Sequence, residues 1–256
     1  MWHDEPERAA HTAPSAAQER KETGRLEALS DGVFAIAMTL LVLSIAPPKS
    51  GATAQATLDQ LKLPLITYVI SFLTILVMWV NHHYMFQFVA RIDRFFVIAN
   101  GLLLMVIVFV NYPTALVADD IQASGAQFAA ITYNVTLIVA AALYNALWFR
   151  IVWRRRLLVS DADDAEVNGY TRQYLLGGPM YVVALALAFV NPGLSIALDA
   201  ALAIFWAFTG KIIRTQHQAQ HQAQHQAQRG AMEAHRLAHQ QELRKSQVDA
   251  PPNEGR

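Results

Sequence analysis

The sequence contains no cysteine, which excludes disulfide bonds, thiolate metal sites and a cysteine nucleophile. Charge is also scarce, because charged residues make up only 16% of the 256 residues, against roughly 25% in a typical soluble domain. The formal net charge is +0, so no basic excess points to a nucleic-acid partner. No segment has the composition of a soluble catalytic domain. We therefore expect no enzyme activity, and we expect no cofactor.

The chain is instead rich in long hydrophobic stretches. Hydrophobic residues account for 54% of it, and they gather in six stretches of about 20 residues, each long enough to cross the ~30 Å hydrocarbon core of a bilayer as a helix. The stretches are residues 26–45, 63–89, 95–117, 126–153, 174–190 and 194–213. The predicted fold is all-α, a polytopic membrane protein with six transmembrane helices.

The basic residues predict the orientation of these helices, because cytoplasmic flanks retain Lys and Arg. With the N-terminus inside, the outer loops hold only Lys49 and Lys62. The inner flanks then hold Arg20, Lys21, Arg25, Arg91, Arg94, Arg150, Arg154, Arg155, Arg156, Arg172, Lys211 and Arg214. The N- and C-termini are therefore both expected in the cytoplasm.

This arrangement divides the chain into three parts. Residues 1–24 are expected to be a disordered cytoplasmic N-terminal tail, residues 25–214 a six-helix transmembrane domain, and residues 215–256 a cytoplasmic Gln/His-rich tail. A repeated HQAQ motif in the last part places His217, His221 and His225 on one helical face. Histidines at this spacing are weak candidates for a metal site, and the alternative is a solvated low-complexity extension.

Asp31 is the outstanding ionisable residue in the apolar stretches, where a charge is costly. Because the second stretch runs the opposite way, His82 and His83 lie at a similar depth. The carboxylate is expected to be buried and to accept hydrogen bonds from Asn81, His82 or His83, with Trp79, one turn away, supplying an indole donor. The sequence leaves open which histidine pairs with it. The expected polar set consists of Ser30, Asp31, Trp79, Asn81, His82 and His83.

Such a network has two readings: it braces the first helix against the second, or it handles protons or ions. The second reading allows a proton-coupled secondary transporter with Asp31 and His82 as its relay. A third class, an intramembrane enzyme with a metal held by Asp31, His82 and His83, is disfavoured because adjacent residues point about 100° apart on a helix.

The first stretch also carries an apolar stripe at helical spacing. Its members are Leu29, Gly32, Ile36, Thr39, Leu40 and Leu43. The stripe can face acyl chains, or it can face a symmetry axis if the polar sides of the helix are buried in protein.

The segment RLEALSDGVFAIA, beginning at Arg25, resembles the first-helix signature of the transmembrane protein 175 family of potassium channels. That signature is an arginine, three residues and Phe-Ser-Asp, and here Leu29 replaces the aromatic residue. The set Trp79, Asn81, His82 and His83 resembles the second recognisable patch of the family.

The resemblance implies a bacterial potassium channel in the plasma membrane, with potassium ions and the bilayer as partners. It implies a homotetramer whose central pore is lined by four copies of the first helix. Ile36 would form a hydrophobic constriction in place of a re-entrant filter loop, Thr39 a polar layer beyond it, and Leu40 and Leu43 the outer lining. Arg25 would join the polar set in bracing this helix and setting its gating equilibrium.

Overall fold

The computed structural model describes residues 15–47, 50–51, 53–120 and 124–207. Its elements are α1 (Ala16–Leu40), η1 (Leu41–Ser44), α2 (Ala54–Gln87), α3 (Arg94–Phe109), α4 (Asn111–Asp120), α5 (Ala126–Trp153), η2 (Arg155–Leu157) and α6 (Asp164–Ala188). A further apolar helix, Pro192–Ala207, follows α6. Within these ranges the only β-pairing is an isolated antiparallel bridge between Val89 and Leu158. The predicted all-α class is confirmed.

Four helical segments are long and apolar enough to cross a membrane: Ala17–Ser44, Ala54–Gln87, Arg94–Asp119 and Ala126–Trp153. The fourth has the boundaries expected from the sequence. The remaining two expected spans correspond to α6, which has a polar first half, and to the Pro192–Ala207 helix, whose expected continuation to residue 213 lies outside the described residues. The chain is a multi-pass membrane protein, and the count of six spans stays a prediction.

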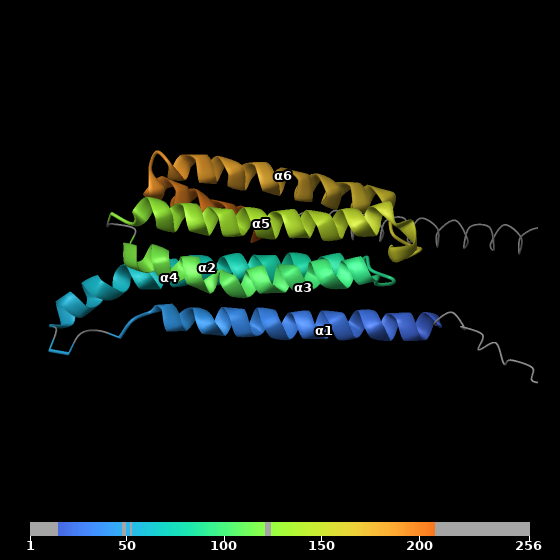
Figure 1. Cartoon of the computed structure of the whole chain (residues 1–256), viewed down its shortest axis with the longest axis horizontal. Coiled ribbons are helices and arrows are strands. Elements are labelled where there is room, and N and C mark those ends of the chain that lie inside the picture. The colour runs from blue at the N-terminus through green and yellow to red at the C-terminus, as the bar shows by residue number, and fades with distance from the viewer. Residues whose placement is uncertain (1–14, 48–49, 52, 121–123, 208–256) are drawn as a thin grey trace, which may run out of the picture. The chain divides into compact units, whose positions relative to one another are not determined.

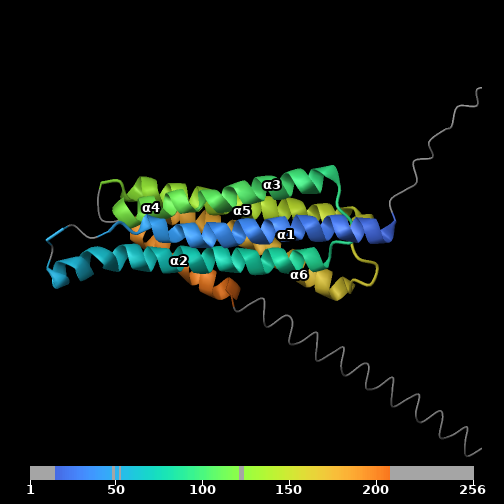
Figure 2. The ribbon, with the colours of Figure 1, turned by 90° about the horizontal axis from the view of Figure 1, so that it is seen from below.

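The helices of residues 15–207 lie side by side, and α1 lies at one edge of them (Figure 1). Seen from below, α1 runs in front, between α2 and α3 (Figure 2). It packs against α2 and α3, whereas α5 packs against α3, α4 and α6. The shared core includes Phe34, Phe96, Leu103, Leu147 and Trp148, which are fully buried. Within the described residues, one side of α1 is therefore covered by the bundle and the other side is exposed.

The expected disordered tail is wrong for residues 16–24, which form the first turns of α1. Ser15 is the N-cap, and its Oγ accepts a hydrogen bond of 3.3 Å from Gln18 N. Glu19 lies in the first turn and accepts from Arg91 Nε at 2.8 Å. The length of a hydrophobic stretch predicts only the part of a helix that lies inside the bilayer. The polar first turns of α1 therefore lie outside what this criterion predicts.

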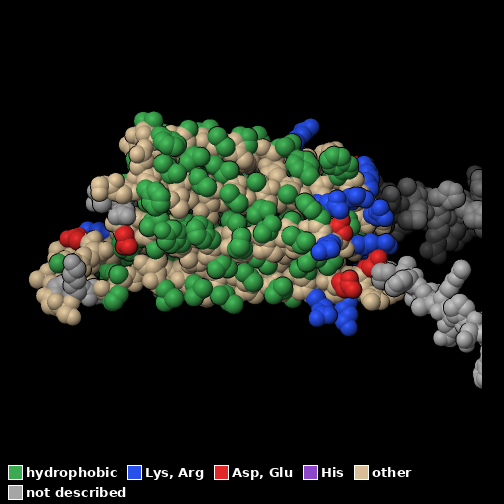
Figure 3. Space-filling model, in the orientation of Figure 1, with side chains coloured by type: hydrophobic (Ala, Val, Ile, Leu, Met, Phe, Trp, Pro, Cys, Tyr) green, Lys and Arg blue, Asp and Glu red, His purple; other side chains and the backbone are tan. Residues whose placement is uncertain are grey.

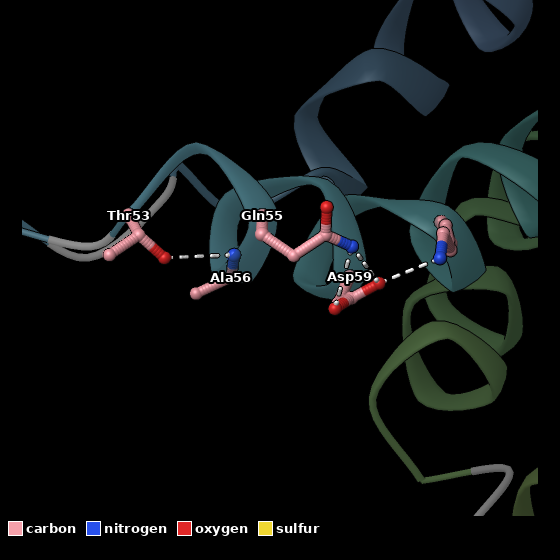
Figure 4. A network of polar contacts seen from close by, with 5 residues as sticks. Thr53, Gln55, Ala56 and Asp59 are labelled. Carbon is pink, nitrogen blue, oxygen red and sulfur yellow. Dashed lines mark hydrogen bonds and ion pairs between the residues drawn. The ribbon is translucent and has the colours of Figure 1, made fainter.

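The expected loop before the second span is shorter than predicted, because α2 begins at Ala54. Thr53 caps the helix through Oγ1, which accepts from Ala56 N at 3.3 Å. In the next turn Gln55 donates to Asp59, which also accepts from Lys62 Nζ at 2.6 Å (Figure 4). Polar pairs three or four residues apart stabilise these exposed turns.

Two other boundaries differ from the prediction. The third span is interrupted at Val110, where α3 ends and α4 begins, and Pro113 lies in the first turn of α4, where the missing N–H is tolerated. The acidic loop before the fifth span ends early, because Asp163 caps α6 by accepting a hydrogen bond of 2.9 Å from Ala165 N.

Basic side chains gather at one end of the bundle, where α1 begins, and the flank between the ends is largely hydrophobic (Figure 3). This end carries the start of α1, the end of α2, the start of α3, the end of α5 and the start of α6. The basic flanks that lie within the described residues are thus on one side of the apolar band.

Candidate functional site

The two faces of α1 differ sharply in burial. Phe34, Ala37 and Leu41 are 0% exposed and pack in the core. On the opposite face Ile36 is 57% exposed and Leu43 is 75% exposed. All the stripe residues predicted from the sequence are exposed: Leu29, Gly32, Ile36, Thr39, Leu40 and Leu43. The structure therefore leaves the stripe without cover from the rest of the described chain.

Thr39 is the one hydroxyl on this stripe. Its Oγ1 donates a hydrogen bond of 2.9 Å to the carbonyl oxygen of Ile36 on the same helix. The hydroxyl hydrogen is thereby occupied, while the oxygen keeps a lone pair. An exposed hydroxyl oxygen held in this way can accept a hydrogen bond or contact a cation.

Asp31 is joined to α2 by Trp79 and not by a histidine. Trp79 Nε1 donates to Asp31 Oδ1 at 2.8 Å. The expected indole donor is therefore confirmed. The expectation that His82 or His83 pairs with this carboxylate is wrong, and Asp31 is half-buried, not fully buried. The Trp79 indole lies one helical turn from the histidines and is the group on α2 that hydrogen-bonds to the carboxylate.

His82 belongs to a separate, fully buried chain of polar groups. His82 Nε2 is 2.8 Å from Asn100 Oδ1 on α3. Asn100 Nδ2 in turn donates to Ser30 Oγ at 2.9 Å, and Ser30 Oγ donates to the carbonyl of Leu26 at 2.8 Å. All three polar side chains are 0% exposed. This chain joins α2, α3 and α1 inside the bundle.

His83 points to a third partner. Its Nδ1 lies 3.1 Å from Glu27 Oε1 on α1, and its Nε2 lies 3.4 Å from Gln87 Nε2 one turn further along α2. The His83 and Trp79 rings stack with their centroids 5.9 Å apart. Glu27 and Asp31 are four residues apart on one face of α1, so both acidic groups meet α2.

Sequence reasoning missed Asn100 and Glu27. Asn100 is a lone amide inside an apolar stretch, and such residues commonly form interhelical hydrogen bonds. Glu27 lies one turn before Asp31, within the signature that begins at Arg25, and is a second acidic group on the same helical face. A lone polar residue in an apolar stretch, and a second acidic residue one turn before Asp31, are both features that predict an interhelical contact.

Two residues of the predicted set do not join these contacts. Arg25 is exposed, and no hydrogen bond or ion pair is found for it within the described part of the chain. Asn81 contributes its backbone oxygen, which accepts from Tyr174 OH at 3.3 Å, and its side chain lines a cavity between α2, α5 and α6. Neither contacts Asp31.

The two alternative classes find little support in this arrangement. Asp31 and His82 are bonded to different partners, so no direct hydrogen bond forms a relay between them. No group of three or more His, Cys, Asp or Glu able to hold a metal exists in the described ranges. The candidates His217, His221 and His225 lie outside the described residues.

A charged contact fixes the end of the bundle beside this network. Asp93 caps α3 by accepting from Phe96 N at 2.8 Å, and it accepts from Arg150 Nε on α5 at 2.9 Å. Partial burial by itself would raise the pKa of Asp93, but the hydrogen bonds from Arg150 and Phe96 outweigh it. The pKa of Asp93 is therefore held below its usual value.

These features define a helical, multi-pass membrane protein whose first helix is anchored by three polar contacts and exposes an apolar stripe. The family model described as "Endosomal/lysosomal potassium channel TMEM175" matches residues 25–110, which include α1 from Arg25 onward and all of α2 and α3. The chain belongs to the TMEM175 family.

Relatives that are matched over nearly their whole length support this membership. A potassium channel of Chamaesiphon minutus is 45% identical over 195 residues, covering 75% of this chain and 96% of the relative. A potassium channel of Streptomyces collinus is 37% identical over 202 residues, covering 77% of this chain and 98% of the relative.

The fold also matches a solved structure. The crystal structure of a lysosomal potassium-selective channel TMEM175 homolog from Chamaesiphon minutus superimposes with a TM-score of 0.66 at 41% identity. The match covers 74% of this chain and 98% of that one. The family suggested by the Arg25–Asp31 signature is therefore confirmed.

Proposed function

We propose that this protein is a potassium-selective cation channel of the plasma membrane, with its pore lined by the exposed stripe of α1. The observation that carries the proposal is the contrast between the two faces of α1. Phe34 and Ser30 on one face are fully buried against the bundle and Asp31 is half-buried, while Ile36, Leu40 and Leu43 on the other face are exposed in the described part of the chain. Membership of a family whose relatives are named potassium channels supports this function.

The pore requires more than one copy of the chain, because each copy supplies one such stripe. We infer a homotetramer with four α1 helices around a central axis, as the family resemblance implies. Association would cover the stripe, and a closed cyclic assembly would place identical residues in rings.

Ile36 forms the constriction in this proposal. A ring of branched apolar side chains is narrow and poorly wetted, so a hydrated cation passes only after a small rotation or dilation of α1. Potassium crosses more readily than sodium because its hydration shell is held less tightly. Thr39 lies one turn beyond, and its hydroxyl oxygen would replace part of the lost hydration. Leu40 and Leu43 continue the lining outward.

The contacts of Asp31, Ser30 and Glu27 act behind the pore. They bind α1 to α2 and α3 from the side away from the stripe. Their strength would set the free-energy difference between the closed and open positions of α1. Arg25 precedes them at the end of the helix and contributes positive charge to the basic flank.

The basic end of the bundle supports a cytoplasmic location for both termini. In this orientation the Ile36 ring lies between the cytoplasmic anchors and the outer end of α1. The channel domain would extend from α1 to about residue 214, followed by the Gln/His-rich cytoplasmic tail.

The test is the reversal potential of the full-length protein in planar bilayers with opposed potassium and sodium gradients. The wild type is expected to reverse toward the potassium equilibrium potential, and Ile36→Asn is expected to shift the reversal toward sodium and to raise leak. Ile98→Asn is the matched control, because Ile98 on α3 is 53% exposed but lies outside α1.

An unchanged potassium preference in Ile36→Asn would remove Ile36 as the constriction. An equal loss of preference in Ile98→Asn would show that the effect is not specific to α1. Flux that saturates and requires a proton gradient would replace the channel by the proton-coupled transporter.

A further inference from the structure

The Pro192–Ala207 helix carries a buried carboxyl group that the proposed pore does not use. Asp199 is 1% exposed, and neither Oδ1 nor Oδ2 has a hydrogen-bond partner among the described residues. Burying an unpaired carboxylate in a low-dielectric environment is very costly, and the cost is higher still at membrane depth. The side chain therefore requires a compensating ligand.

A second unpaired oxygen lies on the neighbouring helix. Asn134 on α5 is 0% exposed, and its Nδ2 donates to Ser195 Oγ and to the carbonyl of Ala130, each at 2.9 Å. Both amide hydrogens are thereby used, and Asn134 Oδ1 has no donor. Ser195 Oγ donates onward to the carbonyl of Ala184 on α6 at 2.7 Å.

Asn134 and Asp199 meet on the same side of the last helix. Ser195 and Asp199 are four residues apart, so they lie on one helical face, and Asn134 is bonded to the first of them. The buried cluster thus contains three acceptor oxygens without a donor: two on Asp199 and one on Asn134.

We propose that Asp199 and Asn134 form a proton-binding site, in which the Asp199 carboxylate takes up one proton from solvent and donates it to Asn134 Oδ1. Binding of one proton neutralises the buried Asp199 carboxylate and makes one of its two oxygens a hydrogen-bond donor. A potassium or sodium ion needs a surrounding shell of oxygen ligands, and three unpaired oxygens supply only part of one. The ligand that this count favours is therefore a proton.

Among the described residues, no cationic side chain is paired with this carboxyl group. The titratable side chains that face Asp199 from the packed helices are Tyr133 on α5 and Tyr181 on α6. Tyr133 OH is already paired with Ser71 Oγ on α2 at 3.3 Å. No Lys, Arg or His within the described ranges forms an ion pair with Asp199.

A route for the proton is also present. Tyr181 lines the cavity between α2, α5, α6 and the last helix, together with Gln173, whose buried Oε1 has no partner either. Ala203, one turn after Asp199 on the same helix, lines this cavity as well. The cavity lining is mostly apolar but includes these polar side chains, and in this proposal water in the cavity supplies the proton to the carboxyl group one helical turn away.

Infrared difference spectroscopy of the full-length protein in liposomes tests the site. The wild type is expected to show a carbonyl band of a protonated carboxylic acid that shifts on exchange into D₂O. Asp199→Asn keeps a hydrogen-bond donor and is expected to lose this band. Asp31→Asn is the matched control and is expected to keep it, because Asp31 is half-exposed and paired with Trp79.

Asn134→Ala provides a second test that leaves the acid in place. Loss of the acceptor is expected to raise the frequency of the wild-type band. A wild-type protein without such a band, or with a carboxylate band that changes on swapping potassium for sodium, would overturn the proton site. The reversal potential is expected to be the same for Asp199→Asn and the wild type, so this proposal and the pore proposal can fail separately.

Discussion

Asn100 on α3 donates from Nδ2 to Ser30 Oγ on α1 at 2.9 Å, and its Oδ1 lies 2.8 Å from His82 Nε2 on α2. One buried amide on α3 therefore joins the two helices that carry the family signature. Since a bilayer offers no water to replace these bonds, loss of the amide leaves buried polar groups unpaired. The position of α1 thus depends on a residue outside both sequence patches.

We expect Asn100→Ala to lower the free energy of unfolding by about 1–3 kcal/mol, because Ser30 and His82 lose a buried partner. Thermal unfolding of the detergent-solubilised protein measures the change. Asn145→Ala is a suitable comparison, because it also removes an interhelical amide contact, to the carbonyl of Tyr174, but leaves α1 untouched. Of the two variants, only Asn100→Ala is also expected to change the open probability of the channel. If Asn100→Ala and Asn145→Ala have the same open probability, the Ser30 contact has no gating role.

Trp79→Phe is expected to destabilise the protein by about 1–2 kcal/mol, because the aromatic volume is largely kept while the hydrogen bond to Asp31 is lost. Trp153→Phe is the control, since Trp153 is 88% exposed. Denaturation of the two variants in the same detergent gives the comparison. If Asp31→Asn added to Trp79→Phe costs as much as it does alone, the two side chains do not interact.

Phe34→Ala and Leu43→Ala test which side of α1 the bundle covers. Phe34 is 0% exposed and Leu43 is 75% exposed. Phe34→Ala is expected to cost about 3–5 kcal/mol through the cavity it creates, while Leu43→Ala changes unfolding little and alters conductance instead. A large loss of stability for Leu43→Ala would place that side chain in a packed core.

The Asp93–Arg150 contact predicts a pH dependence. Because the pKa of Asp93 is lowered in the folded protein, this group stabilises the fold above its unfolded pKa, about 3.8, and the stabilisation is lost as the pH falls toward the folded value. Asp93→Asn is expected to cost about 1–2 kcal/mol at neutral pH, an estimate reduced for partial exposure, and nothing at low pH. Unfolding of both proteins from pH 7 to acid measures this, and a constant difference would contradict it.

Much of the fold could be read from the chain, because a bilayer imposes simple requirements. Apolar stretches of sufficient length must be helical, and residues 126–153 have the boundaries that this reasoning predicts. The exposed stripe on α1 was equally accessible, since helical periodicity alone sorts Ile36 and Phe34 onto opposite faces. Polar helix ends such as residues 16–24 lie outside this requirement and were missed.

Partner choice among polar side chains is where the sequence was insufficient. Asp31, His82 and His83 have equivalent depth along their helices, but depth does not specify rotation or the neighbour on a third helix. Packing turned His82 toward Asn100 and His83 toward Glu27, and it left Trp79 facing Asp31. Hydrogen bonds extend only about 3 Å, so a small rotation of α2 exchanges one partner for another.

The sequence by itself determined a multi-pass helical membrane protein, its family and the two faces of its first helix, because each of these depends on local composition and spacing. The tertiary structure decided which side of α1 is covered, which residues anchor it and where Asp199 is buried. Those properties depend on contacts between residues far apart in the sequence, such as Ser30 and Asn100, which are 70 positions apart. Only the packing of the helices brings such residues within bonding distance.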